Sequence, residues 1–123
     1  MNNKKFRVWG NIQKKFEYFE LNNITVPDRL LSQHSYPIQQ SLGILDKNMK
    51  EVYEGDVVKG IYGLEGIDII GEVRYSYDWC SYVVDWYHEI SNIAFDSLEI
   101  VGNVFEDYMY DEKGELVKKL ALS

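Results

Sequence analysis

Three carboxylates, Glu51, Glu54 and Asp56, form the densest group of side chains in this sequence that is suited to acid–base or metal chemistry. Paired carboxylates can act as general acid and base or bind a divalent cation. In a regular strand Glu54 and Asp56 would share one face, but Gly55 between them favours a sharp bend. We therefore expect a structural corner at Glu54, Gly55 and Asp56, where the two carboxylates accept hydrogen bonds from backbone amides.

The other residues with reactive side chains are scattered along the sequence. His34 and His88 form no His-x-x-x-His pattern, and Cys80 is the only cysteine, so it has no partner for an internal disulfide or a zinc site. The sequence contains no Gly-x-Ser-x-Gly elbow and no glycine-rich phosphate loop. We predict a protein that is not an enzyme, with no catalytic residues, no cofactor and no metal ion.

Aromatic residues form the second candidate site, on an expected hairpin. The candidate interface residues are Tyr75, Tyr77, Trp79, Tyr82 and Trp86. Strand alternation places the first three on one face of a strand and the last two on one face of its partner. Such a face either fills the core or, if exposed, suggests a subunit contact. Base stacking is a further reading, but the hairpin carries one basic residue among four acidic ones, which disfavours nucleic acid.

The elements that must position these side chains are mostly strands. Alternating apolar residues and turn residues predict strands at 5–9, 16–21, 42–45, 50–61, 67–75, 81–87 and 98–105. Pro27 suits the first turn of a short helix, and Gly102 indicates a bulge in the last of these strands. Residues 111–114 predict a turn, and the pattern leaves residues 116–120 open between a helical turn and a strand. The spacing favours a mainly β protein, a small SH3-like, partly open β-barrel with added hairpins and one or two short helices.

Composition and charge narrow the class of protein. The chain has 123 residues, 46% of them hydrophobic, which suits one folded domain spanning 1–123. No apolar run is long enough to cross a bilayer or form a secretory signal, so we expect a cytoplasmic protein without membrane contact. The first fifteen residues carry five basic side chains and no acidic one, whereas the remaining 108 carry eight basic and twenty acidic ones. This asymmetry opposes broad binding to phosphate backbones and would let the basic end meet the acidic body of a second copy.

Three segments resemble the YopX family of small phage and prophage proteins, namely 5–9, 45–58 and 98–106. Their order and spacing match across roughly residues 4 to 107. Two features depart from the family pattern. Met49 follows Asn48 where the family commonly has Asn-Gly, and within the tail extension at 104–123 the part beyond Asp107 runs longer than the usual short ending. The resemblance implies a mostly β fold that forms homo-oligomers in a phage or prophage setting, and it implies no agreed activity.

These observations favour a non-enzymatic, phage-encoded protein that self-assembles and binds another host or phage protein in the bacterial cytoplasm. Exposed sheet edges and aromatic faces are natural docking surfaces. One alternative is an acidic decoy of a host nucleic-acid-binding protein. Others are a weak nucleic-acid-binding β-barrel that uses residues 1–15 and the aromatics, and a hydrolase or metal enzyme around Glu54 and Asp56.

Overall fold

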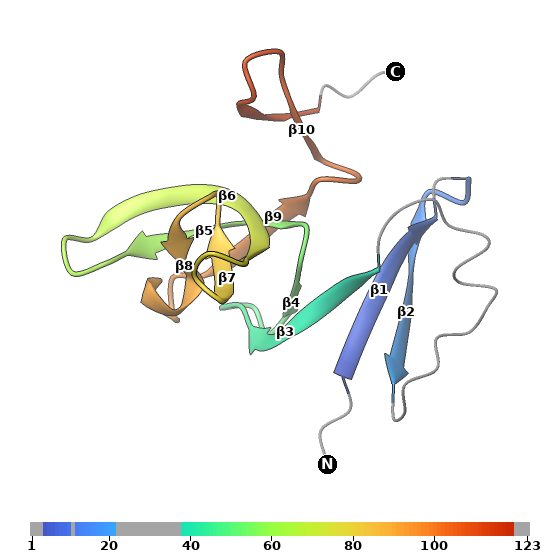
Figure 1. Ribbon diagram of the computed structural model, residues 1–123, viewed down its shortest axis with the longest axis horizontal. Coiled ribbons are helices and arrows are strands. Elements are labelled where there is room, and N and C mark those ends of the chain that lie inside the picture. The colour runs from blue at the N-terminus through green and yellow to red at the C-terminus, as the bar shows by residue number, and fades with distance from the viewer. Residues whose placement is uncertain (1–3, 11, 22–37, 120–123) are drawn as a thin grey trace.

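The computed structural model describes residues 4–10, 12–21 and 38–119 (Figure 1), and within them the chain is mainly β. The elements are β1 (Lys4–Gly10), β2 (Lys15–Leu21), β3 (Gln39–Leu45), β4 (Glu51–Tyr53), β5 (Asp56–Tyr62), β6 (Ile67–Ser76), β7 (Ser81–Val84), β8 (His88–Glu89), the 3-10 helix η1 (Ile90–Asn92), β9 (Glu99–Asn103), β10 (Tyr108–Tyr110) and β11 (Leu116–Lys118). The prediction of a mainly β fold is confirmed.

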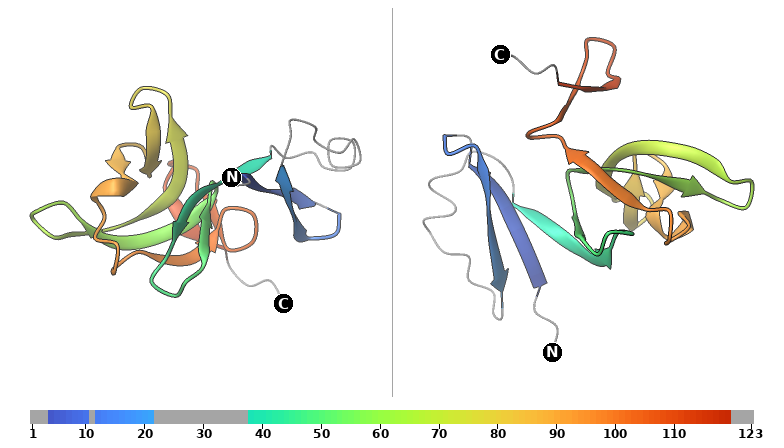
Figure 2. Two further views of the ribbon diagram at one scale, coloured as in Figure 1. Left: turned by 90° about the horizontal axis from the view of Figure 1, so that it is seen from below. Right: turned by 180° about the vertical axis from the view of Figure 1, so that it is seen from behind.

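The strands form three antiparallel sheets, with the orders β2-β1-β3-β4, β8-β7-β6-β5-β9 and β10-β11. Figures 1 and 2 show the β1–β2 hairpin at one end of the molecule and the curled five-stranded sheet at the other, with β3 and β4 between them. The β10–β11 hairpin, here called the tail hairpin, projects away from both. No sheet closes on itself within the described ranges, so the architecture is partly open, as predicted.

The chain passes from the four-stranded to the five-stranded sheet at Gly55. The expected strand at 50–61 is divided there, because β4 ends at Tyr53 and β5 begins at Asp56. Gly55 has φ +87°, a conformation that side chains with a Cβ rarely adopt. A Cβ at this position would also lie 3.1 Å from Cε2 of Phe105. Glycine therefore permits both the turn and the close packing at this corner.

The main core lies within the five-stranded sheet and its flanking segments. It contains the buried residues Val52, Val58, Val73, Val84, Ile93 and Leu98. Val57 and Val58 are adjacent in β5 and both fully buried, and since neighbouring strand residues point to opposite faces, β5 is covered on both sides here. β5 is thus an interior strand with side chains buried on both of its faces.

A bulge in β9 brings the tail close to the sheet. Val57 pairs with Gly102 but Val58 pairs with Ile100, which leaves Val101 as an extra residue and confirms the bulge predicted at Gly102. A Cβ on Gly102 would lie 2.8 Å from both Asp107 and Tyr108. The absent side chain lets the start of the tail fold back against β9.

Several boundaries differ from those expected. The strand predicted at 81–87 ends at Val84, because Asp85 adopts φ +64° and redirects the chain. Residues 116–118, left open between helix and strand, form β11. The helix expected after Pro27 lies outside the described residues, and the described helical element is η1. Met49 adopts φ +65° in the β3–β4 turn despite its side chain.

Candidate functional site

The carboxylates of the corner bind the backbone. Oε1 of Glu54 accepts a hydrogen bond from the amide of Gln40 at 3.0 Å, and Oδ2 of Asp56 accepts one from the amide of Tyr53 at 2.8 Å. Asp56 is 3% exposed. Both side chains therefore hold β3, β4 and β5 together, which is the arrangement expected of a structural corner.

A residue that sequence reasoning did not select, Arg7, completes the corner from β1. Its Nη2 lies 2.9 Å from Oδ1 of Asp56 and donates to the carbonyl of Glu54, while its Nε donates to Oε1 of Gln39. The guanidinium also lies over the ring of Phe16, 4.1 Å from its centroid. Arg7 is 4% exposed, so it is an internal residue and not part of a basic surface.

The electrostatics of the corner follow from its burial. Burial raises the pKa of Asp56, and the neighbouring Arg7 guanidinium opposes that rise. Burial, reinforced by the negative charge of Glu51, raises the pKa of Tyr53 to about 12. A cavity of about 400 Å³ adjoins these residues and is lined by Lys50, Glu51 and Glu106 as well. Arg7 already pairs with the carboxylate of Asp56 and covers the ring of Phe16. The corner therefore fits a structural role better than an acid–base one.

Three of the candidate interface residues form a continuous row of rings, which we call the aromatic row: Tyr77, Tyr75 and Tyr82. The ring of Tyr75 lies 5.2 Å from that of Tyr77 and 5.2 Å from that of Tyr82, both edge to face. Tyr77 is 87% exposed and Tyr82 is half-buried against the core. Burial, then the charge of Glu54, raises the pKa of Tyr82, so the row extends from solvent toward the corner.

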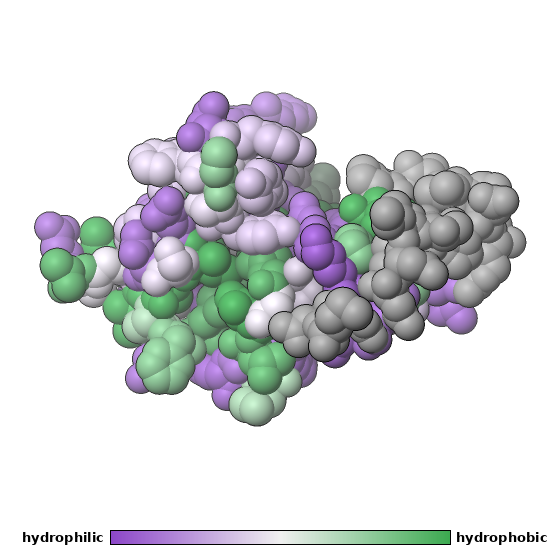
Figure 3. All heavy atoms as spheres, turned by 60° about the horizontal axis from the view of Figure 1, so that its bottom comes forward, coloured by the Kyte–Doolittle hydropathy of each residue, from purple (hydrophilic) through white to green (hydrophobic). Residues whose placement is uncertain are grey.

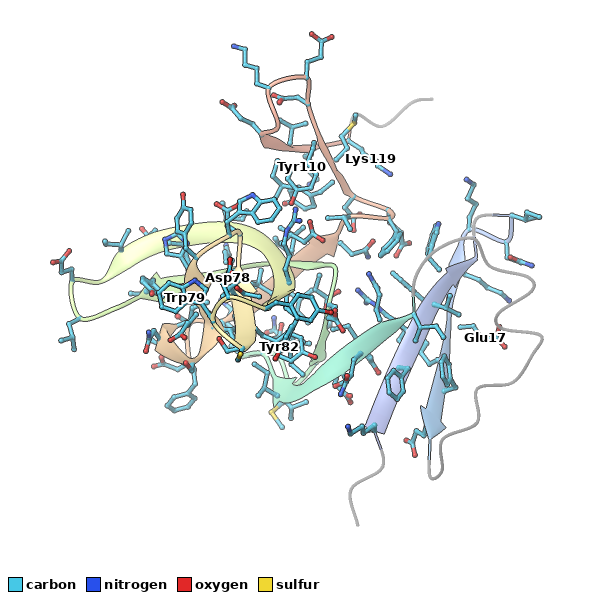
Figure 4. All side chains as sticks on the ribbon, in the orientation of Figure 1. Glu17, Asp78, Trp79, Tyr82, Tyr110 and Lys119 are labelled. Carbon is cyan, nitrogen blue, oxygen red and sulfur yellow. The ribbon has the colours of Figure 1, made fainter. Side chains whose placement is uncertain are left out.

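Trp79 lies on the same hairpin, in the turn between β6 and β7, and is 56% exposed. Its amide donates to the hydroxyl of Ser76, and Cys80 after it adopts φ +51°. Figure 4 shows Trp79 and Tyr82 on this hairpin, with Tyr82 toward β3. The hairpin thus presents exposed rings on a turn that is fixed by its own hydrogen bonds.

Trp86 lies away from the other candidates. The guanidinium of Arg74 is 4.0 Å from its ring centroid, and Arg74 alternates with Tyr75 in β6, so Trp86 is on the opposite face of the sheet from the aromatic row. The expectation that Trp86 shares a face with Tyr82 is wrong. The strand alternation behind it ends at Val84, where the turn at Asp85 begins.

The tail hairpin docks on this opposite face through Tyr110. The Tyr110 hydroxyl donates to Oε1 of Glu72 at 2.6 Å and accepts from Nη2 of Arg74 at 2.5 Å. Arg74 also pairs with Glu72 at 2.9 Å. Burial, with the hydrogen bond to Glu72, raises the pKa of Tyr110 to about 12. Sequence reasoning missed this contact because the residues lie 36 and 38 positions apart.

Exposed apolar side chains also occur outside the aromatic hairpin. Figure 3 shows apolar side chains gathered on the face that it turns toward the viewer. Exposed apolar residues elsewhere in the fold include Ile44, Leu45 and Met49 of the β3–β4 hairpin and Phe95 after η1. These residues were not selected from the sequence, because an isolated apolar side chain in a strand or turn gives no signal of its exposure.

No group of three potential metal ligands occurs among the described side chains, and His88 packs between the rings of Tyr62 and Tyr87. Cys80 is exposed and is not in a disulfide. In the part of the chain that the structure describes, no helix is long and apolar enough to span a membrane.

The fold and these sites together define a small, mainly β protein whose two larger sheets are joined at a polar corner, with an exposed aromatic hairpin and a docked tail hairpin. A family model described as YopX protein matches residues 27–108. The chain belongs to the YopX family. No curated protein matches it in sequence. The family match is consistent with a phage-type protein of unknown specific role.

Proposed function

We propose that this chain is a non-enzymatic, phage-type protein that self-assembles and acts by binding protein partners in the bacterial cytoplasm. The observation that carries the proposal is the aromatic row, together with the exposed Trp79 in the turn of the same hairpin. Tyr and Trp are the residues most enriched at the energetic centres of protein interfaces. We assign the first contact of this surface to a second copy of the chain.

The geometry suits an interface because the rings are already ordered. Tyr75 contacts a ring on each side, and Tyr82 is anchored against the core. An aromatic side chain held in this way loses little conformational entropy when a partner covers it. Trp79 adds a large ring at the edge of the same hairpin.

The charge distribution favours protein over nucleic acid as the partner. The net charge is −7, and at least two of the five basic side chains in the first fifteen residues are paired internally, Arg7 with Asp56 and Lys5 with Glu51. These pairs reduce the positive charge that the β1–β2 hairpin offers to a phosphate backbone. The same pairs weaken the hypothesis that the basic first fifteen residues bind the acidic remainder of a second copy.

Light scattering at several protein concentrations tests the proposal. We expect a mass above 14.5 kDa that rises or stays high with concentration. A strict monomer across the range would remove self-assembly from the proposed function.

A further inference from the structure

The outer face of the β5–β6 hairpin carries two exposed isoleucines and two opposite charges. The strand register pairs Lys59 with Ile70 and Ile61 with Asp68. Paired residues share a face of the sheet, and so do residues two apart in one strand, so these four side chains lie together. All four are exposed, and we call them the isoleucine face. In Figure 1 the turn of this hairpin lies at the end of the molecule opposite the β1–β2 hairpin.

The alternate positions of the same two strands face the core. Val58 and Val73 belong to the buried core cluster, and Tyr62 and Ile69 pack against it. When one face of an antiparallel sheet covers the core, the other face normally presents polar side chains to water. Two isoleucines on that outer face therefore gain free energy when a second surface removes them from water.

The basic part of the isoleucine face keeps a positive charge that the chain does not neutralise. Nζ of Lys59 and Nζ of Lys47 lie 3.4 Å and 3.2 Å from the same atom, Oε1 of Glu99. The hydrogen bond from Lys47, helped by that from Lys59, lowers the pKa of this carboxyl, which is therefore ionised at neutral pH. Two ammonium groups share one carboxylate, so one positive charge is left over. Each ammonium group has three donors and can still donate to a partner.

The acidic part of the isoleucine face is Asp68. Its side chain is exposed, and it forms no salt bridge with the residues that the structure describes. A cavity of about 520 Å³ is lined by Lys47 and by all four residues of the isoleucine face, so the charges and the isoleucines border one hollow. Lys59 and Asp68 are diagonal neighbours across the two strands, and so are Ile61 and Ile70.

We propose that the isoleucine face binds the isoleucine face of a second copy of the chain across a two-fold axis. An axis along the diagonal from Ile61 to Ile70 sets each isoleucine against the same residue of the other copy. The same rotation sets Lys59 of each copy opposite Asp68 of the other. The diagonal arrangement thus makes the face complementary to itself in both shape of pattern and charge. Under this symmetry the two hairpins cross at a steep angle, as orthogonally packed sheets do.

The contact adds to the assembly described under the proposed function and rests on it. Four side chains cover less than the area of about 800 Å² per partner that a standard stable interface needs. Between copies that are already held together, a small second contact forms at a high effective concentration. Tyr75 of the aromatic row lies on the opposite face of β6 from Ile70, so the two contacts do not overlap. Two separate contacts on each chain extend the assembly beyond a dimer.

Sedimentation equilibrium of the full chain after charge exchange tests this contact. Asp68→Lys or Lys59→Glu alone places like charges opposite each other twice across the axis. We expect either variant to self-associate about tenfold more weakly than the wild type. An equimolar mixture of D68K and K59E restores opposite charges at both positions between unlike chains. We therefore expect the average mass of the mixture to return to that of the wild type, a rescue that misfolded variants could not give.

The matched control is Glu112→Lys, which makes the same charge change in the exposed turn of the tail hairpin and should assemble like the wild type. The proposal is overturned if the single variants assemble like the wild type, if their mixture stays as light as they are, or if E112K is weakened as much as D68K. All these chains keep the aromatic hairpin, so such results would leave the proposed function standing. A wild type that is monomeric throughout would instead remove the self-assembly on which both proposals depend.

Discussion

Arg7 in β1 and Asp56 in β5 form an ion pair of 2.9 Å in which both side chains are about 5% exposed. The pair joins the two sheets across the corner, and neither residue could be exchanged for a neutral one without leaving a buried charge. Asp56 also accepts a hydrogen bond from the amide of Tyr53, and Arg7 also donates to the carbonyl of Glu54 and the side chain of Gln39. The corner at Gly55 therefore depends on a strand more than 40 residues away in the sequence.

Removing Asp56 is expected to destabilise the fold strongly. Asp56→Ala leaves the Arg7 guanidinium buried without its counter-charge, and such a change costs about 3–5 kcal/mol of unfolding free energy. Denaturant titration measures it. The matched control is Glu51→Gln, which breaks the exposed Lys5–Glu51 pair and is expected to cost at most about 1 kcal/mol. Similar losses in both variants would contradict a buried role for Asp56.

Gly55 has two roles: it adopts a positive φ, and it leaves room for close packing. A comparison with Gly63 separates their contributions to stability. Both residues have positive φ, +87° and +72°, but an added Cβ would meet Gln39 and Phe105 at Gly55 and nothing within 4 Å at Gly63. Gly63→Ala is expected to cost about 1–2 kcal/mol from the backbone alone. Gly55→Ala is expected to cost clearly more, measured as a lower melting temperature. A smaller effect at Gly55 would show that Gln39 and Phe105 can move to accommodate the added Cβ at little energetic cost.

Asp46 makes stability depend on acidic pH. Burial by itself raises the pKa of this carboxyl, but the amides of Ile100, Lys50 and Asn48 donate to it and hold the pKa below its ordinary value of 3.8. Since the folded-state pKa is lowered, the stabilisation is fully present above about pH 4 and is lost as the pH falls through the folded-state value.

The Asp46→Asn variant checks this assignment. An amide group cannot accept hydrogen bonds at both of its ends, so we expect about 1–3 kcal/mol lower stability at pH 7. The difference between the two proteins is expected to shrink as the pH falls toward and through the lowered folded-state pKa of Asp46, where the carboxylate takes up a proton. Denaturant titrations at pH 7 and pH 3 measure it, and a constant difference would argue against the carboxylate as the cause.

Tyr110 anchors the tail hairpin, which has two strands and would be marginal alone. Tyr110→Phe removes the hydroxyl that joins Glu72 and Arg74. We expect amide hydrogen exchange in β10 and β11 to become about five- to tenfold faster, with the core strands unchanged. Tyr108→Phe, in the same strand, serves as the control and should leave exchange unaltered. Unchanged exchange in the Tyr110 variant would mean that other contacts hold the tail.

Local patterns predicted much of the fold. The turn at Gly55 and the bulge at Gly102 were predictable because glycine within a strand pattern marks a bend or a close approach, and both positions have neighbours that exclude a side chain. The β1–β2 hairpin was predictable from alternation and the turn residues after Gly10.

Long-range contacts were not predictable in the same way. Alternation identifies Arg7 as a polar residue between apolar neighbours, which reads as a solvent-facing position, yet β1 lies between β2 and β3 and its partner Asp56 is distant in the sequence. The position of Trp86 depended on a positive φ at Asp85, a residue type that gives only a weak signal for it. Both cases show tertiary contacts overriding a local pattern.

The proposed function is tested most directly by sedimentation equilibrium of two matched double variants. Tyr77→Ser with Trp79→Ser removes rings that are 87% and 56% exposed, and Phe95→Ser with Tyr87→Ser removes rings that are 87% and 61% exposed elsewhere. We predict that the first variant shifts toward the 14.5 kDa monomer while the second assembles like the wild type. Unchanged assembly in the first variant, or an equal loss in both, would contradict the aromatic hairpin as the self-assembly surface.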